Sequence, residues 1–190
     1  MQPTMPPLKP APREKLVFDH TVESVIRLLG KQPSPAQAAA LLKLGVDVGK
    51  PLLPAYPLST YLAVKDYVGS QRWPHLPPDQ AHFEQGRAFI KGYAETWMGK
   101  ALFTVARALG PERMLERMSH NFRGGNNFTE TRLTKLGPAR FELWFNIVTR
   151  VHHVRGILTT GLEMTGARSP EVKVLSFEEP EATFLITWSA

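Results

Sequence analysis

The spacing of hydrophobic residues changes once along this chain, and that change restricts the folds available to it. Up to about residue 122, apolar residues recur three and four positions apart, as on one face of a helix. Beyond residue 130 they alternate with polar residues, which is typical of strands with one buried face. The segment between them, RGGNNFTE at residues 123–130, is rich in small and turn-forming residues. Helices first and strands later predict an α+β fold rather than repeated βαβ units.

The C-terminal part predicts an antiparallel sheet of about four strands. Residues 140–148 place Phe141, Leu143, Phe145 and Ile147 on one face, and a helical pattern follows at residues 151–165. Residues 171–177 and 182–188 then form a closing hairpin. The predicted order is strand-strand-helix-strand-strand, with the N-terminal helices packed on the sheet.

The longest helical run begins at Asp79, which predicts a cap, and reaches residue 109. Gly86, Gly92 and Gly99 interrupt it. Glycine inside a helix costs about 1 kcal/mol relative to alanine. These glycines therefore predict close approach to a helix or ligand, or a kink near Gly99. The sequence Leu109-Gly110-Pro111 predicts a stop and a restart.

Proline content sets the predicted domain boundary. Residues 1–14 contain five prolines and little to bury, which predicts a disordered tail. Residues 15–190 are expected to form a single domain, helical at 15–122 and sheet-containing at 123–190. The chain lacks cysteine, a signal-peptide pattern and any apolar run long enough for a membrane span. A cytoplasmic location without disulfides is the expectation.

Catalytic and metal-binding motifs are missing from the sequence. It contains no G-x-S-x-G, no P-loop and no H-E-x-x-H pattern. His152 and His153 are adjacent, so they face different sides of a helix and cannot share one metal ion. A non-enzymatic protein with no metal site and no cofactor is therefore predicted.

The net charge of +6 comes from one segment. Residues 98–155 hold ten basic and four acidic residues (Lys100, Arg107, Arg113, Arg117, Arg123, Arg132, Lys135, Arg140, Arg150, Arg155; Glu112, Glu116, Glu130, Glu142). Such a bias suits an acidic partner or a nucleic acid. The basic residues are spaced singly among apolar ones, however, which favours a solvated surface and argues against nucleic acid.

Seven residues are candidates for binding a ligand or a partner. Arg123 and the following glycines could form a backbone nest for an anion, although a glycine-permitted reversal of the chain is the favoured interpretation. The asparagines beside them could satisfy loop backbone or anchor a ligand. Aromatic residues are mostly core, yet some could line a pocket between the long helix and the sheet. The candidates are Phe89, Tyr93, Trp97, Arg123, Asn126, Asn127 and Trp144.

Several stretches resemble a paralogous family of uncharacterised myxobacterial proteins. They are FIKGYAETWMGKAL at residues 89–102, LGPER at 109–113, NFRGGNNFTETRLTKLGPARFELWFN at 121–146, FDHTVE at 18–23 and PLLPAYP at 51–57. The C-terminal half is also distantly similar to the superfamily of haem-NO-binding domains, 4-vinyl-reductase-type domains and TRAPP subunits. That superfamily implies a ligand pocket or a dimerising scaffold. The Y-x-S-x-R haem signature is missing, which argues against haem.

The resulting functional prediction is a small-molecule-binding or sensory domain with an apolar pocket. The alternative is a dimeric TRAPP-like adaptor that binds a protein partner such as a small GTPase. Nucleic-acid binding is the third interpretation.

Overall fold

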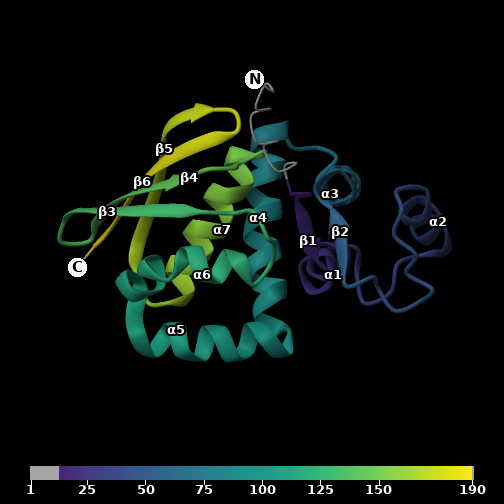
Figure 1. Cartoon of the computed structure of the whole chain (residues 1–190), viewed down its shortest axis with the longest axis horizontal. Helices are drawn as coiled ribbons and strands as arrows, with labels where there is room; N and C mark the ends of the chain where they lie inside the picture. Colours follow the sequence, from purple (N-terminus) through teal and green to yellow (C-terminus); the bar gives the residue numbers. More distant parts are fainter. Residues whose placement is uncertain (1–12, 190) are drawn as a thin grey trace, which may run out of the picture.

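The computed structural model describes residues 13–189, and the side chains of Trp97, Met98 and Ser119 lie outside that description. The predicted tail at residues 1–14 falls outside it except for its last two residues. Two short strands, β1 (Leu16–Phe18) and β2 (Ala55–Pro57), pair in antiparallel orientation near the N-terminus. Helices α1 (Asp19–Ile26) and α3 (Leu58–Arg72) pack against this pair, the 3-10 helix η1 (Arg27–Leu29) follows α1, and α2 (Pro35–Lys43) lies farther out, at the edge of the molecule. The described part of the chain thus begins with a small helical layer (Figure 1).

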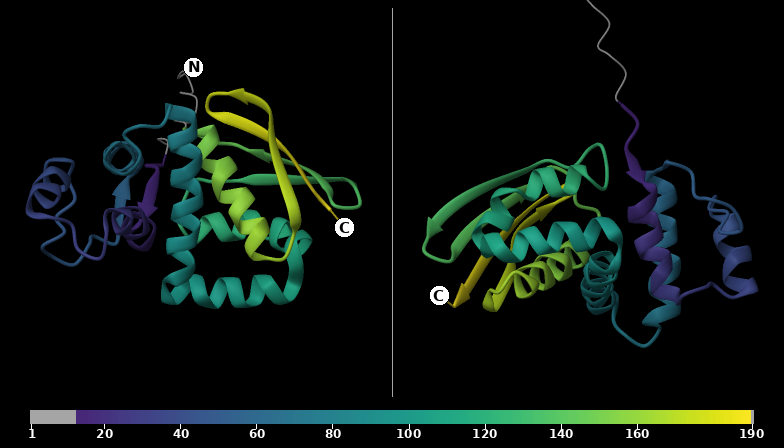
Figure 2. Two further views of the ribbon diagram at one scale, coloured as in Figure 1. Left: turned by 180° about the vertical axis from the view of Figure 1, so that it is seen from behind. Right: turned by 90° about the horizontal axis from the view of Figure 1, so that it is seen from below.

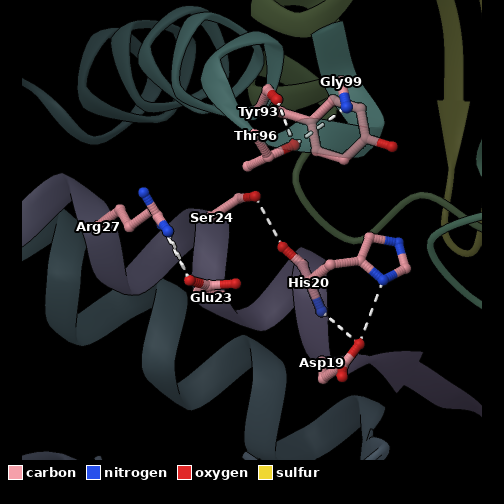
Figure 3. Close-up of polar contacts among 8 residues, drawn as sticks. All are labelled: Asp19, His20, Glu23, Ser24, Arg27, Tyr93, Thr96 and Gly99. Atoms are coloured by element: carbon pink, nitrogen blue, oxygen red, sulfur yellow. Dashed lines mark hydrogen bonds and ion pairs between the residues drawn. The ribbon is translucent and has the colours of Figure 1, made fainter. Parts of the chain in front are cut away.

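The predicted long helix is two helices, α4 (Pro78–Glu95) and α5 (Trp97–Glu116). Thr96 has an extended backbone and separates them. Its Oγ1 accepts a hydrogen bond from the Gly99 N–H at 3.0 Å and donates to the Tyr93 carbonyl at 2.7 Å (Figure 3). The cap turns the chain sharply, so the kink expected near Gly99 is a change of helix (Figure 2).

Gly110 is the second break, because its φ of 81° is non-helical and Pro111 restarts the helix. This confirms the predicted stop and restart. The short helix α6 (Met118–Arg123) follows and leads into residues 123–130.

The C-terminal part confirms the predicted strand-strand-helix-strand-strand order. Strands β3 (Thr131–Gly137) and β4 (Arg140–Phe145) precede α7 (Val151–Met164), and β5 (Arg168–Glu178) and β6 (Glu181–Ser189) follow it. All neighbours are antiparallel in the sheet order β3-β4-β6-β5. Phe141, Leu143 and Phe145 are buried, as their alternation predicted. Helix α7 lies between this sheet and α4 (Figure 2).

Helices α4 and α7 approach so closely that glycine is required on both. A Cβ on Gly86 would overlap the backbone carbonyl of His153, and a Cβ on Gly156 would overlap that of Phe83. An Arg87–Glu163 ion pair at 3.3 Å joins the same helices. The predicted close approach between helices therefore occurs at Gly86. This contact fixes the position of His153 along the axis of α4.

Residues 123–130 join the first strand to the large sheet. The Asn127 side chain accepts from the Leu16 N–H at 2.9 Å and donates to the Glu14 carbonyl at 3.0 Å. The Asn126 side chain accepts from the N–H groups of Phe128 and Thr129 at 3.1 and 2.8 Å. Both asparagines thus satisfy loop backbone.

The buried side chains form two hydrophobic cores. One packs α5, α6 and α7 against the sheet and includes Leu115, Leu158 and Phe184. The other packs α1, α3 and α4 around β1 and includes Val25, Val64 and Phe89. Residues of both cores face each other where α4 crosses α7, and the cavity described below lies there.

Candidate functional site

A partly enclosed cavity of about 180 Å³ lies between the two cores. Its walls come from β1, from α1, α3, α4, α5, α6 and α7, and from the segments that precede β3 and α7. Among residues 13–189, none of those that line it belongs to β3–β6. The pocket expected between the long helix and the sheet is therefore displaced to the space among the helices, because α7 covers the sheet face that α4 would otherwise contact.

His153 is the cavity's most unusual residue. It is 3% exposed, and neither of its ring nitrogens has a hydrogen-bond partner among residues 13–189. Burial, helped by the nearby Lys65 and His82, holds the pKa of the imidazole well below its usual range. The ring is therefore neutral near pH 7, and it presents one N–H donor and one nitrogen lone pair.

Lys65 supplies a buried amine to the same cavity. The residue is 5% exposed, and its carbonyl accepts from the Gln85 side chain at 2.7 Å. Burial first and Arg150 second lower the pKa of the Lys65 amine to about 7, while Asp66 opposes the change. Asp66 is already held by Arg150, with an N–O distance of 2.8 Å.

The aromatic wall comes from α4. The rings of Phe89 and Tyr93 stack with centroids 6.3 Å apart, and Phe89 lies 5.8 Å from the His153 ring. The Tyr93 ring also lies 6.3 Å from that of His20 on α1, and Figure 3 shows Tyr93 beside the Thr96 cap and His20 beside Asp19. Two of the four predicted aromatic residues, Phe89 and Tyr93, line the cavity. The third, Trp97, has a side chain outside the described part of the structure.

The other predicted site residues divide between the cavity and the surface. Asn126 lines the cavity, although its side-chain oxygen is used by the loop. Asn127 ties β1 to the same loop. Arg123 forms an exposed ion pair with Glu130 at 3.6 Å, and the Trp144 indole donates to Glu181 at 3.0 Å. The structure does not bring these last three to the cavity, and their role in binding a partner stays a prediction.

Sequence reasoning missed Lys65 and His153 as residues of the cavity. His152 and His153 were considered only as a pair that cannot share one metal ion. The feature that could have identified His153 is its position three residues before Gly156, on an apolar face of the helix. Lys65 has no distinguishing local pattern, since a lysine in a helix is usually solvated. Within the described residues, no group of three His, Asp or Glu side chains is arranged to hold a metal ion.

The family described as a protein of unknown function, DUF2378, matches residues 15–189. The chain belongs to the DUF2378 family. This confirms the resemblance to a family of uncharacterised proteins. No curated protein matches this DUF2378 chain. None of its described helices has the length and apolar character that crossing a membrane requires.

Solved structures similar to this DUF2378 chain are H-NOX domains. An oxygen-binding H-NOX domain related to soluble guanylate cyclases has a TM-score of 0.65 at 12% identity, covering 90% of this chain and 92% of that one. An Fe(II) unliganded H-NOX protein mutant from K. algicida has a TM-score of 0.63 at 13% identity, covering 91% and 97%. The likeness establishes an H-NOX-like α+β fold.

The prediction of no cofactor, with haem disfavoured, is contradicted by these neighbours. A further similar structure is described as showing modulation of haem redox potential through protein-induced porphyrin distortion (TM-score 0.67, 11% identity, covering 90% of this chain and 92% of that one). The prediction relied on a missing Y-x-S-x-R signature. A short signature can be lost while the fold that surrounds it persists, so its absence was insufficient.

The residues present fit haem in their donor chemistry. A buried neutral imidazole without a hydrogen-bond partner is the form of histidine that ligates iron. The cavity volume of about 180 Å³ is smaller than the roughly 300–1,000 Å³ of pockets that enclose drug-sized ligands. A porphyrin would therefore enter only if side chains that line the cavity moved outward.

Proposed function

We propose that this chain is a non-enzymatic small-molecule-binding or sensory domain, in which the cavity receives the ligand and His153 is the polar anchor. The observation that carries the proposal is the buried, unpartnered imidazole in a cavity lined mainly by apolar side chains. A buried donor or acceptor left unsatisfied costs about 1–3 kcal/mol. A ligand that forms a hydrogen bond or a coordinate bond with His153 would recover that free energy. If the cavity bound nothing, an apolar residue in place of the histidine would make the protein more stable.

The H-NOX-like fold supports the same proposal and makes haem the first ligand to test. Bound haem would supply iron with an open coordination position. His153 would hold it, and Phe89 and Tyr93 would cover one side of the binding space and keep water away. The contact between Gly86 of α4 and the His153 backbone of α7 would hold the imidazole at a constant position relative to α4.

The test is titration of the purified protein with haemin and then with small aromatic molecules. For haem we expect an absorption spectrum of histidine-ligated iron, and for either ligand a rise in melting temperature. His153→Ala should abolish the histidine spectrum and weaken binding by at least about tenfold, which is roughly 1.4 kcal/mol.

The matched control is His152→Ala on the same helix. His152 lies beside the cavity-facing residue but lines the surface groove, where its Nε2 is 3.4 Å from an Asp79 carboxylate oxygen. This variant should bind as the wild type does. The proposal fails if neither haemin nor any aromatic probe binds, or if the two variants behave alike.

The two alternative functions, a dimeric adaptor and a nucleic-acid-binding protein, remain predictions. Both depend on the basic segment, and several of its charges are locally engaged. Arg150 pairs with Asp66, Arg113 with Glu116 at 3.0 Å, and Lys135 with Glu112 at 2.5 Å. No observation on the described surface favours either alternative over the cavity.

A further inference from the structure

The charged groups that line the cavity are all cationic. Among the described residues around it, Lys65 and Arg150 carry basic side chains, and no Asp or Glu contributes to the wall. The remaining lining is apolar or aromatic apart from hydroxyl, amide and imidazole groups. A wall with basic and no acidic side chains suits an acidic ligand better than it suits an empty gap in the core, because a buried cation needs a counter-charge.

Lys65 is the member of the pair without a partner. Arg150 holds Asp66 through Nε and Nη2, and its Nη1 donates to the Thr149 carbonyl at 3.1 Å. Within the part of the chain that the structure describes, neither a hydrogen bond nor an ion pair reaches the Lys65 amine. The Lys65 Nζ lies over the Tyr61 ring, 5.4 Å from the ring centroid. The neighbouring carboxylate is thus already used, and the amine is available to a ligand.

The position of Lys65 suits the charged end of a ligand. Lys65, Thr149 and Arg150 line both the apolar cavity and a surface groove that also includes His82 and His152. The amine therefore stands at the wall between the groove and the cavity. A carboxylate bound there would lie at the polar edge, and an apolar body would extend towards Phe89.

The volume limits the size of that body. An apolar cavity of roughly 150 Å³ accommodates benzene, and this one measures about 180 Å³. One aromatic ring with a short acidic substituent therefore fits without rearrangement. A long alkyl chain or a polycyclic molecule would require the walls to move.

We propose that the cavity binds a small aromatic monocarboxylic acid, with its carboxylate paired to the amine of Lys65 and its ring in the apolar interior. This inference rests on the proposed ligand-binding function and specifies its ligand class. The low pKa of the Lys65 amine supports it, since a carboxylate would restore the charge that burial removes. The neutral His153 ring is free to donate a second hydrogen bond to the carboxylate, in addition to the one from the Lys65 amine.

The experiment compares three probes that share one body and differ in charge: phenylacetate, 2-phenylethanol and 2-phenylethylamine. Each is titrated into the full chain near neutral pH, with amide NMR shifts at Ile157 and Gly161 reporting occupancy of the cavity. We expect the acid to bind at least about tenfold more tightly than the alcohol, and the amine to bind most weakly.

Lys65→Met should remove the preference for the acid while alcohol binding persists, which shows that the variant is folded. Lys91→Met, at an exposed lysine of α4, should keep the wild-type preference. The inference is overturned if the alcohol binds as tightly as the acid, if the Lys65 variant still prefers the acid, or if none of the probes binds. Alcohol binding without acid preference would leave the proposed function intact, and haemin binding tests that function separately.

Discussion

Lys65 and His153 are the two buried polar groups whose environment departs most from that of ordinary helix residues. Each is desolvated, and the pKa of each is lowered. Neither has a charged partner within reach, since Arg150 occupies Asp66. Residues of this kind are expensive for stability and are therefore concentrated at functional sites.

The Lys65 amine predicts a specific dependence of stability on pH. Its pKa is about 7 in the folded protein and 10.5 as the ordinary value, so the unfolded chain binds more protons between these limits. Stability should therefore rise with pH through this window, by on the order of 2 kcal/mol between about pH 7 and about pH 9. Arg150 and Asp66 both face the amine, and the raised pKa of the buried Tyr61 acts only above this interval.

Urea unfolding of the wild type and of Lys65→Met at the two pH values measures the effect. The variant should lose most of the rise in unfolding free energy, and it should be the more stable protein at the lower pH. Lys91→Met should behave as the wild type does. A wild-type free energy that is flat across this interval would show that the amine is solvated in solution.

At the scale of elements, the crossing of α4 and α7 places the site. Gly86 and Gly156 each sit against backbone of the opposite helix, so the two axes approach more closely than side chains would permit. The backbone carbonyl that Gly86 contacts belongs to His153. The contact that sets the spacing of α4 and α7 therefore involves the same residue, His153, that faces the cavity.

Gly86→Ala is predicted to destabilise the protein by about 1–3 kcal/mol, because the added methyl group meets backbone that cannot rotate away. Gly92→Ala on the same helix is the matched control. Beyond its chain neighbours and its own helix backbone, no atom of the described part of the structure lies within 4 Å of a Cβ at that position, so alanine should stabilise by up to about 1 kcal/mol. Denaturant unfolding of the two variants decides the matter, and effects of the same sign would argue against close helix contact.

Local patterns predicted the elements better than the site. The alternation at residues 140–148 placed Phe141, Leu143 and Phe145 correctly, and Gly110-Pro111 marked a real break. Phe89, Tyr93 and Asn126 were expected near a pocket and do line the cavity. The pocket's location was wrong, because no local pattern shows that α7 would lie between α4 and the sheet.

At the scale of the whole molecule, two cores meet around incompletely filled space. Ala106 of α5 belongs to the core against the sheet and also lines the cavity. Phe89 of α4 belongs to the other core and faces the same space. The cavity is thus a gap in the packing between the N-terminal helices and the sheet-bearing part.

Ala106→Leu should fill part of this gap. We predict a gain of about 0.5–2 kcal/mol in unfolding free energy, as for other cavity-filling substitutions, together with weaker binding of aromatic probes. Ala101→Leu, at an exposed position of the same helix, should change stability by no more than about 0.5 kcal/mol. Thermal unfolding and probe titration report the two effects, and a large loss of stability in the first variant would mean that the space is already filled.

The types and order of the elements follow from the residues alone, because helix and strand periodicity, proline and capping residues act over a few positions. The α+β class and the antiparallel C-terminal sheet are determined at that level. Lys65 and His153 are separated by 88 positions, and only the packing of α3, α4 and α7 brings them to one cavity. Burial then converts an ordinary lysine and an ordinary histidine into unpartnered groups, since the loss of water and the use of Asp66 by Arg150 are properties of the folded chain.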